Sequence, residues 1–236
     1  MLTLGIDTTA GSASVALLSE ETLLSEYTLN SGNTHSQTLL PMIEHMFDRV
    51  GKTPRDIDLY ACAVGPGSFT GVRIGAATVQ GLASPWNTPC VPVSALAALA
   101  QNLAIVRGRI CPVMNARRRQ VYTALFESDG TGVLHRTHPD AALSLAELEQ
   151  LLREANTPVY FVGDGYDLTE PFRQTHTPER LRYQSAVSVA LCGQRIYLAA
   201  EDKTAFSAAA LLPTYLRKPQ AEREREERMK EQEKDK

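Results

Sequence analysis

A glycine-rich stretch from residue 65 to residue 75 has the clearest potential for chemistry, and it reads Gly-Pro-Gly-Ser-Phe-Thr-Gly-Val-Arg-Ile-Gly. A glycine-rich turn at the start of a helix can bind phosphate through its free N–H groups and the helix dipole. The stretch is not a Walker loop, because no Gly-Lys-Ser or Gly-Lys-Thr follows it. Gly71 and Gly75 lie on one face of the predicted helix, which equally favours close packing, including packing at an interface.

Asp7, Thr8 and Thr9 occupy a predicted turn between two strands near the start of the chain. Backbone N–H groups in such a turn can cradle an anion. With Gly67 and Ser68 of the glycine-rich stretch, these residues form a candidate nucleotide or phosphate loop. The simpler interpretation is a plain hairpin in which Asp7 hydrogen-bonds its own turn, and it is favoured while the tripeptide is taken alone.

The histidines and cysteines form no recognisable ligand set or catalytic pair. The sequence has no His-x-x-x-His or Glu-x-x-His motif, so we predict no metal site. His35 and His45 are too far apart along one helix to share a metal, and we expect all five histidines at the surface. The four cysteines include no Cys-x-x-Cys pair. Ser68 has no identifiable histidine partner, so we predict no catalytic residue.

Three consecutive arginines, Arg117, Arg118 and Arg119, lie in a predicted turn between two strands. Such a cluster can contact RNA phosphates, although it is more often a solvated loop. The formal net charge of the chain is −3. This value argues against a stand-alone nucleic-acid-binding protein but leaves RNA contact within a complex open.

The elements that position these residues form two α/β units, residues 1–104 and 105–218, followed by a charged tail over residues 219–236 that we expect to be flexible or helical. In the first unit, hydrophobic patterns predict strands over residues 2–6, 14–18, 22–29, 57–64 and 91–93, and helices over 36–50, 69–83 and 94–104. In the second unit they predict strands over residues 110–114, 121–126 and 159–162, and helices over 144–155 and 187–200.

Two of the predicted helices have unusual compositions. Apolar residues in the helix over residues 36–50 fill an arc of about 160°, wider than the stripe of about 100° that packing on one sheet requires. In the helix over residues 69–83, Arg73 is the only charged residue, and Gly71, Gly75 and Gly81 interrupt it. Each glycine costs about 1 kcal/mol relative to alanine. Both features predict an additional close contact.

The start of the chain has no basic region, and Asp7 interrupts the first apolar run, so we predict no signal peptide. No apolar stretch reaches membrane-spanning length. We expect a cytoplasmic protein without a membrane partner.

Several motifs, taken together, resemble those of the TsaB family. The match covers the chain up to about residue 218, and the glycine-rich stretch is its most specific part. The other motifs are Ile-Asp-Thr-Thr at residues 6–9, His-Ser-Gln at 35–37, Leu-Pro-Met-Ile at 40–43, Asn-Ala-Arg at 115–117 followed by Val-Tyr at 121–122, and Pro-Thr-Tyr-Leu-Arg at 213–217.

The resemblance implies a two-lobed actin/hexokinase/Hsp70-like fold, of the ribonuclease H-like ATPase kind, without ATPase activity. It implies a non-catalytic scaffold subunit for transfer of the threonylcarbamoyl group to tRNA adenosine next to the anticodon. The implied partners are the catalytic paralogue TsaD, the ATPase TsaE and, through the complex, tRNA; without TsaD a homodimer is expected. The chain itself requires no cofactor, while ATP or ADP is expected at most at the interface of the complex.

In this family the first two helices of the N-terminal lobe form a helical bundle with the partner. The resemblance therefore implies an interface made by Leu39, Met42, Ile43, Met46, Gly71, Arg73, Ile74, Gly75 and Thr78. Such a bundle would explain the wide apolar arc and the tolerated glycines. We accordingly expect replacement of Met46 by aspartate to abolish pairing with TsaD while the monomer stays folded.

The sequence departs from its relatives at positions that bear on catalysis. TsaD-like chains carry a His-x-x-x-His metal motif on the helix after Pro-Val, whereas residues 94–99, which follow Pro92 and Val93, contain no histidine. The TsaB family usually has aspartate at the position of Asn115, and glycine and glutamate at those of Arg119 and Gln120. Loss of the acidic side chain argues further against ATP hydrolysis.

Two other classes of function stay open. The first is an enzyme of the same fold, either a small-molecule kinase or ATPase or a glycoprotease-like enzyme. The second is a homodimeric interaction protein without a tRNA role. ATP turnover by the purified chain alone would favour the first class, and normal tRNA modification after loss of the protein would favour the second.

Overall fold

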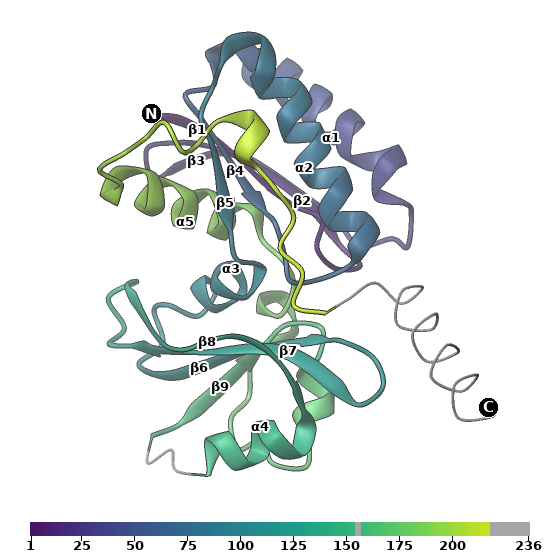
Figure 1. The fold of residues 1–236 in the computed structure, drawn as a ribbon, viewed down its shortest axis with the longest axis vertical. Coiled ribbons are helices and arrows are strands. Elements are labelled where there is room, and N and C mark those ends of the chain that lie inside the picture. Colours follow the sequence, from purple (N-terminus) through teal and green to yellow (C-terminus); the bar gives the residue numbers. More distant parts are fainter. Residues whose placement is uncertain (154–156, 218–236) are drawn as a thin grey trace, which may run out of the picture.

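The computed structural model describes residues 1–153 and 157–217, which fold into two lobes, each built on one sheet (Figure 1). The predicted charged tail lies outside the described residues. The last part of the helix predicted over residues 144–155 does so as well.

The first sheet has five strands in the order β3-β2-β1-β4-β5. The three N-terminal strands are antiparallel, whereas β4 and β5 run parallel to β1. Parallel neighbours need a crossover connection, which a helix supplies between β4 and β5. The strands are β1 (Leu2–Asp7), β2 (Ala13–Ser19), β3 (Thr22–Leu29), β4 (Leu59–Ala63) and β5 (Cys90–Val93).

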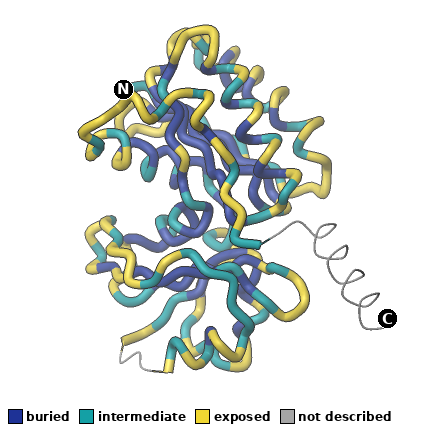
Figure 2. Tube along the Cα trace, in the orientation of Figure 1, coloured by how far each residue is buried: buried dark blue, intermediate teal, exposed yellow. Residues whose placement is uncertain are grey.

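Helices α1 (His35–Val50) and α2 (Phe69–Ala83) cover one face of this sheet, and α5 (Ala186–Ala199) covers the other (Figure 1). Side chains alternate between the faces, as strand geometry requires. Val15 and Leu17 belong to the core beneath α1, whereas Ala16 and Leu18 pack against α5. Figure 2 shows that the central strands are buried throughout.

Small residues let α5 approach the sheet closely. A Cβ atom added at Gly5 in β1 would lie 2.2 Å from the carbonyl oxygen of Ala186, and one at Gly193 would lie 2.4 Å from the Cβ of Ala61. Larger side chains at these positions would therefore separate α5 from the sheet.

The second sheet has four strands in the order β8-β7-β6-β9. Helix α4 (Leu145–Leu152) packs on one face, and α3 (Ala95–Gln101) packs on the face that is turned toward the first lobe (Figure 1). Cys111 shares a core with Leu148 of α4, whereas its neighbour Ile110 shares one with Leu99 of α3. The strands are β6 (Gly108–Asn115), β7 (Gln120–Ser128), β8 (Leu134–Ser144) and β9 (Val159–Val162).

Both sheets repeat one topology. Each begins with three antiparallel strands and then adds a strand parallel to the first one on its free side. The turn between β1 and β2 therefore corresponds to the turn between β6 and β7. The sequence predicted paired strands at the start of both units, which the structure confirms.

The chain crosses between the lobes after α3 and again before α5, and Asn102 connects the two crossings. Its Nδ2 donates to the carbonyl oxygens of Leu181 and Tyr183 at 3.1 and 2.8 Å, and its Oδ1 accepts from the Ser188 hydroxyl at 2.7 Å. The predicted division at residue 104 needs correction, because α5 returns to the first sheet. The segment after it also lies on the first lobe (Figure 1).

Local sequence signals predicted many element boundaries correctly. The predicted helix over residues 69–83 and the predicted strands over 22–29 and 159–162 have the observed bounds. Gly51 ends α1 in the left-handed region, and Ser144 forms a capping box with Glu147 at the start of α4. Strand β8 was not predicted, because polar residues and Pro139 obscure its alternation.

The interface predicted for α1 needs correction. The exposed fractions of Leu39, Ile43 and Met46 are 1%, 1% and 0%. They pack in the core with the sheet and α2. The wide apolar arc is therefore explained largely by contacts within the chain, and these three side chains have no surface to offer a partner.

Replacing Met46 by alanine should lower the free energy of unfolding by about 2–5 kcal/mol, because it leaves a cavity in the core. Replacing it by aspartate should prevent folding, since an unpaired charge would be buried. The matched control is Leu40→Ala in the same helix, where the side chain is 45% exposed and we expect a loss below about 1 kcal/mol. Urea unfolding measures all three, and equal losses for Met46→Ala and Leu40→Ala would contradict this assignment.

Candidate functional site

The turn after β1 and the glycine-rich start of α2 lie directly against each other. The backbone N–H of Ser68 donates to the carbonyl oxygen of Thr9 at 2.7 Å. The Thr8 hydroxyl donates to the carbonyl oxygen of Gly71, also at 2.7 Å. The structure thus brings together all five residues of the predicted phosphate loop, Asp7, Thr8, Thr9, Gly67 and Ser68.

The glycines at the start of α2 are explained by this close approach. A Cβ atom at Gly67 would lie 2.2 Å from the carbonyl oxygen of Thr9, and one at Gly71 would lie 2.0 Å from that of Thr8. At Gly75 it would lie 2.5 Å from the Thr8 hydroxyl oxygen. The sequence predicted an additional close contact here, and the contact lies within the chain. Gly71 and Gly75 are buried, which corrects their assignment to a partner interface.

Several hydrogen-bond donors of this turn are engaged inside the chain. Thr8 and Thr9 are fully buried. The backbone N–H and the hydroxyl of Thr9 both donate to Asp7 Oδ1, at 2.8 and 2.7 Å, and the Ser68 hydroxyl oxygen accepts from the Gly71 N–H. A phosphate would have to displace these bonds. These bonds favour the packing interpretation of the turn over phosphate binding.

The carboxyl group of Asp7 is fully buried, and its Oδ2 has no hydrogen-bond partner among the described residues. Burial raises the pKa of Asp7 from its ordinary value of 3.8 to about 6, against the opposing effect of the two bonds from Thr9. Near neutral pH the folded chain therefore carries a poorly solvated charge at the end of β1.

The outer face of α2 is exposed and nearly uncharged. Thr70, Arg73, Ala77 and Gly81 are exposed, and Ile74 and Thr78 beside them are half-buried. These positions span an arc of about 140° at the helical 100° per residue. We call this set the α2 surface. Of the predicted interface residues, Arg73, Ile74 and Thr78 lie on it, and Met42 is half-buried on α1.

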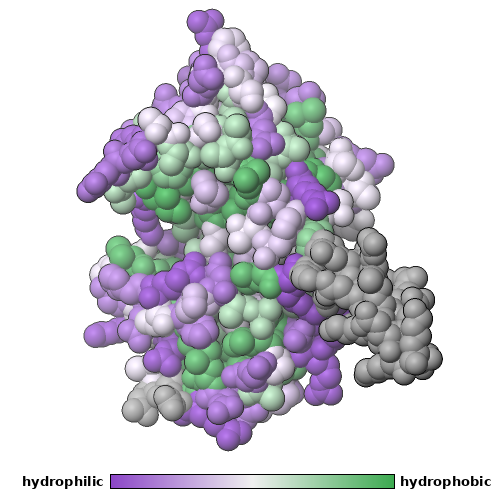
Figure 3. All heavy atoms as spheres, viewed as in Figure 1, coloured by the Kyte–Doolittle hydropathy of each residue, from purple (hydrophilic) through white to green (hydrophobic). Residues whose placement is uncertain are grey.

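The first lobe also exposes apolar side chains on α1 and in the segment after α2. Leu40 of α1 is 45% exposed, and Trp86, just after α2, is 49% exposed. On the opposite side of α2 lies the C-terminal segment, where Tyr215 is 39% exposed. Hydrophobic residues also gather on the first lobe in the space-filling view, while hydrophilic residues line its boundary with the second lobe (Figure 3).

The three consecutive arginines form the turn between β6 and β7, which we call the arginine turn. Arg117, Arg118 and Arg119 are exposed and have φ values of 60°, 54° and 57°. A left-handed conformation costs roughly 1–2 kcal/mol for each residue other than glycine. The turn is held by Asn115, whose Oδ1 accepts from the Arg117 N–H at 2.8 Å, and by a bond from the Gln120 N–H to the Arg117 carbonyl oxygen.

An acidic side chain that the sequence did not identify as important lies beside this turn. Asp164, just after β9, accepts the backbone N–H of Asn115 at 3.0 Å through Oδ1. Desolvation by neighbouring atoms raises the pKa of its carboxyl group, although the residue as a whole is exposed. The sequence signal for this residue was the Gly-Asp-Gly at residues 163–165. Glycine is needed at position 163 because a Cβ atom there would lie 2.2 Å from the Val113 carbonyl oxygen. This segment packs against β6 as the start of α2 packs against the first turn.

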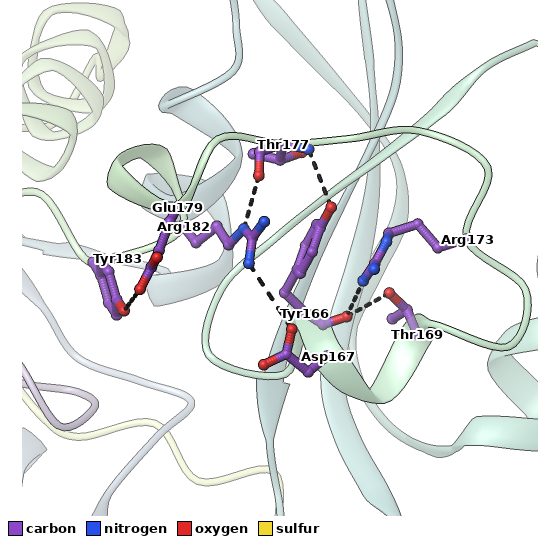
Figure 4. Close-up of polar contacts among 8 residues, drawn as sticks. All are labelled: Tyr166, Asp167, Thr169, Arg173, Thr177, Glu179, Arg182 and Tyr183. Carbon is purple, nitrogen blue, oxygen red and sulfur yellow. Dashed lines mark hydrogen bonds and ion pairs between the residues drawn. The ribbon is translucent and has the colours of Figure 1, made fainter.

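A tyrosine held between two arginines fixes the irregular segment that follows (Figure 4). The guanidinium groups of Arg173 and Arg182 lie 3.8 and 3.6 Å from the centre of the Tyr166 ring. The Tyr166 hydroxyl accepts from the Thr177 N–H, and the Arg182 Nε donates to the Thr177 carbonyl oxygen. These guanidinium groups are therefore engaged in holding the segment that leads back to α5.

The described residues offer little for nucleophilic or metal chemistry. Burial raises the pKa of Cys90 and Cys111 to about 12 and that of Cys192 to about 11, so these thiols are protonated at neutral pH. Over residues 1–153 and 157–217, no three His, Cys, Asp or Glu side chains group to hold a metal ion. His35 is not at the surface as expected: it is half-buried, with Nε2 2.7 Å from the Ala10 carbonyl oxygen.

None of the helices in the described part of the chain has the length and apolar character needed to cross a membrane.

Two lobes with this repeated topology define the actin/hexokinase-like class of ATPase folds. Two solved structures from Pseudomonas aeruginosa agree with it: a protein described as similar to peptidase YEAZ, with a TM-score of 0.75, and YeaZ, with 0.72. Both are 28% identical to this chain; they cover 92% and 91% of it, and 99% of their own chains. The ethanolamine utilization protein EutJ from Carboxydothermus hydrogenoformans, at 12% identity, shares the fold with a TM-score of 0.53.

Sequence comparisons identify the family. The family model "TsaD: tRNA N6-adenosine threonylcarbamoyltransferase" matches residues 22–224. A curated relative from Bacillus subtilis, "tRNA threonylcarbamoyladenosine biosynthesis protein TsaB", is 32% identical over 94% of this chain and 96% of its own length. The relative of that name from Escherichia coli is 33% identical over 70% and 72%. The chain belongs to the TsaB family and takes part in threonylcarbamoyladenosine biosynthesis.

Replacing Asp7 by asparagine tests the buried charge. The wild-type carboxyl group is protonated in both states well below its unfolded pKa of 3.8. Because its folded pKa is raised to about 6, the folded state loses stability relative to the unfolded state as the pH rises from 3.8 through 6. The stability of Asp7→Asn relative to wild type should therefore increase by about 2 kcal/mol between pH 4 and pH 7.5. Urea unfolding at both values measures this change, and a difference independent of pH would contradict the assignment.

Two glycine-to-alanine substitutions in α2 should act in opposite directions. Gly71→Ala places a methyl group against the Thr8 carbonyl oxygen and should destabilise the protein by about 1–3 kcal/mol. Gly81→Ala meets nothing within 4 Å and should stabilise by up to about 1 kcal/mol, because alanine favours a helix. Thermal unfolding of both variants checks this, and a neutral Gly71→Ala would rule out the close contact.

Proposed function

We propose that this protein is a non-catalytic scaffold subunit that pairs with TsaD through the α2 surface. In that complex, with TsaE, the threonylcarbamoyl group is transferred to tRNA adenosine next to the anticodon. The observation that carries the proposal is the α2 surface: it is exposed, and Arg73 is its only charged residue. A helix with an uncharged outer face of small residues is suited to close packing against another helix.

The shape of the α2 surface supports pairing with a helical partner. Ala77 and Gly81 leave space for a second helix to approach closely. Leu40 on α1 and Trp86 just after α2 supply exposed apolar area that a partner would remove from water. In the absence of TsaD, the same surface would pair with a second copy of this chain, since a two-fold axis can place identical patches against each other.

The chemistry of the transfer is assigned to TsaD. The sequence lacks the His-x-x-x-His motif after Pro92 and Val93, and the buried thiols are not activated as nucleophiles. The chain requires no cofactor in this proposal. Because the donors of the turn at Thr8 and Thr9 are engaged, any ATP or ADP is placed at the interface of the complex.

Transfer RNA would reach this subunit through the arginine turn. Arg117, Arg118 and Arg119 are exposed at one edge of the second lobe, and guanidinium groups bind phosphate oxygens. With a net charge of −3, the chain has no basic field to bind RNA alone, so this contact supports RNA already held by the complex. A tRNA-modifying complex of this kind would work in the cytoplasm.

Replacing Ala77 by arginine should abolish pairing with TsaD, because a long charged side chain would occupy the centre of the α2 surface. Ala77 is exposed, and arginine is a good helix former, so the melting temperature should stay unchanged. The matched control is Ile105→Arg, at a residue that is 80% exposed in the connection after α3. Isothermal titration with TsaD should show at least about a hundredfold weaker binding for Ala77→Arg alone.

The same variants test the role in cells. In cells depleted of this protein, Ile105→Arg should restore threonylcarbamoyladenosine in tRNA, measured by mass spectrometry of nucleosides, and Ala77→Arg should not. Unchanged modification after depletion would refute the proposed function. Turnover of ATP by the isolated chain would instead favour an enzyme.

A further inference from the structure

The C-terminal segment after α5 runs along α2 toward the second lobe (Figure 1, yellow). Leu211 is fully buried, and its carbonyl oxygen accepts from Gln80 Nε2 of α2 at 2.9 Å. The Thr214 N–H then donates to the carbonyl oxygen of Val64 at 2.7 Å. A Cβ atom at Gly65 would lie 2.4 Å from the Thr214 carbonyl oxygen. The segment is thus fastened beside the start of α2.

Tyr215 attaches this segment to α2. Its ring stacks on Phe69, with centres 4.4 Å apart and planes at 15°. Its hydroxyl accepts from Arg73 Nε at 2.8 Å. Arg73 is the only charged residue of the α2 surface, so Tyr215 holds a side chain that would meet a partner there.

Arg217 attaches the same segment to the second lobe. Its Nη1 donates to the carbonyl oxygen of Ala116 at 2.9 Å. Ala116 directly precedes the arginine turn, and its N–H donates to the backbone carbonyl oxygen of Gln120 across the base of that turn. Two residues of the Pro-Thr-Tyr-Leu-Arg motif therefore connect α2 with the arginine turn.

We propose that Tyr215 and Arg217 are positioning residues that hold the arginine turn at a fixed place relative to the α2 surface. This inference rests on the proposed function. A partner docked on α2 and an RNA phosphate bound at the arginine turn are then held at a fixed position relative to each other. A turn with consecutive left-handed residues keeps its shape only where its surroundings impose it, and the bond from Arg217 is one such constraint. Holding the turn in place before RNA binds reduces the entropy lost on binding.

The first test uses the isolated chain and needs no RNA. Arg217→Met removes the guanidinium group and keeps an unbranched side chain, whereas Arg217→Lys keeps a donor. Amide hydrogen exchange of Ala116 and Gln120 should become at least about tenfold faster in Arg217→Met and stay close to wild type in Arg217→Lys. Arg180→Met is the matched control, because it removes an exposed arginine elsewhere in the second lobe. Unchanged exchange in Arg217→Met would overturn the positioning role, whatever the result with RNA.

The second test measures tRNA binding by the complex with TsaD as a function of salt. The slope of log K against log salt is negative, and each phosphate contact makes it steeper. If Arg217 acts by positioning the turn, Arg217→Met should reduce the magnitude of this slope by about two units, because several phosphate contacts are lost together. A direct contact by Arg217 alone predicts a loss of about one unit. Arg180→Met should change neither slope nor affinity, and all variants should pair with TsaD within about twofold of wild type.

A double variant separates positioning from direct binding. The losses of tRNA affinity in Arg119→Met and Arg217→Met should not add in the double variant. Arg217→Met displaces the whole turn and so already removes the contact that Arg119 makes. Additive losses would overturn the proposal. If Arg119→Met leaves tRNA affinity unchanged while pairing with TsaD is intact, the RNA contact is refuted and the pairing function stands. If wild type does not pair with TsaD, the proposed function fails, and the exchange experiment still decides the positioning role.

Discussion

The close approach of α2 to the turn after β1 constrains much of the first lobe. Gly67, Gly71 and Gly75 present bare backbone to Thr8 and Thr9, and the Thr8 hydroxyl and the Ser68 N–H connect the two segments. This contact fixes the start and direction of α2 over the sheet. It also directs the opposite side of the helix outward, where small and uncharged residues remain exposed. The same contact thus engages several donors of a potential anion site and leaves the outer side of α2 exposed.

The two lobes repeat one topology and use its equivalent turns differently. In the first lobe Thr8 and Thr9 of the turn are fully buried under α2, with Asp7 at the base of the turn, while Gly11 is exposed. In the second lobe the corresponding turn is exposed and carries three arginines, and only the short Gly163–Gly165 segment packs near its base. The packed first turn carries no basic side chain, whereas the exposed second turn carries arginines, whose guanidinium groups can bind an anion. The two equivalent turns therefore differ in burial and in charge.

Long-range contacts hold the two lobes together. Asn102 holds both crossings between the lobes, and the C-terminal segment returns along α2 to reach Ala116. Both connections include side chains that donate to backbone carbonyl oxygens, which fixes the path of the chain at these points. The motif at residues 213–217 stood out in the sequence, yet its contacts span the whole molecule.

Local signals allowed the sequence by itself to determine the family, the alternating α/β pattern and many element boundaries. Gly51 and the Ser144–Glu147 capping box mark helix ends because their hydrogen bonds reach only a few residues along the chain. The glycines of α2 indicated a close contact, but the sequence could not identify the partner surface. Only the tertiary structure decided that Met46 faces the chain's own core, that α5 returns to the first sheet and that Tyr215 meets Arg73. Burial and pairing of this kind depend on residues far apart in sequence, which periodicity within one element does not specify.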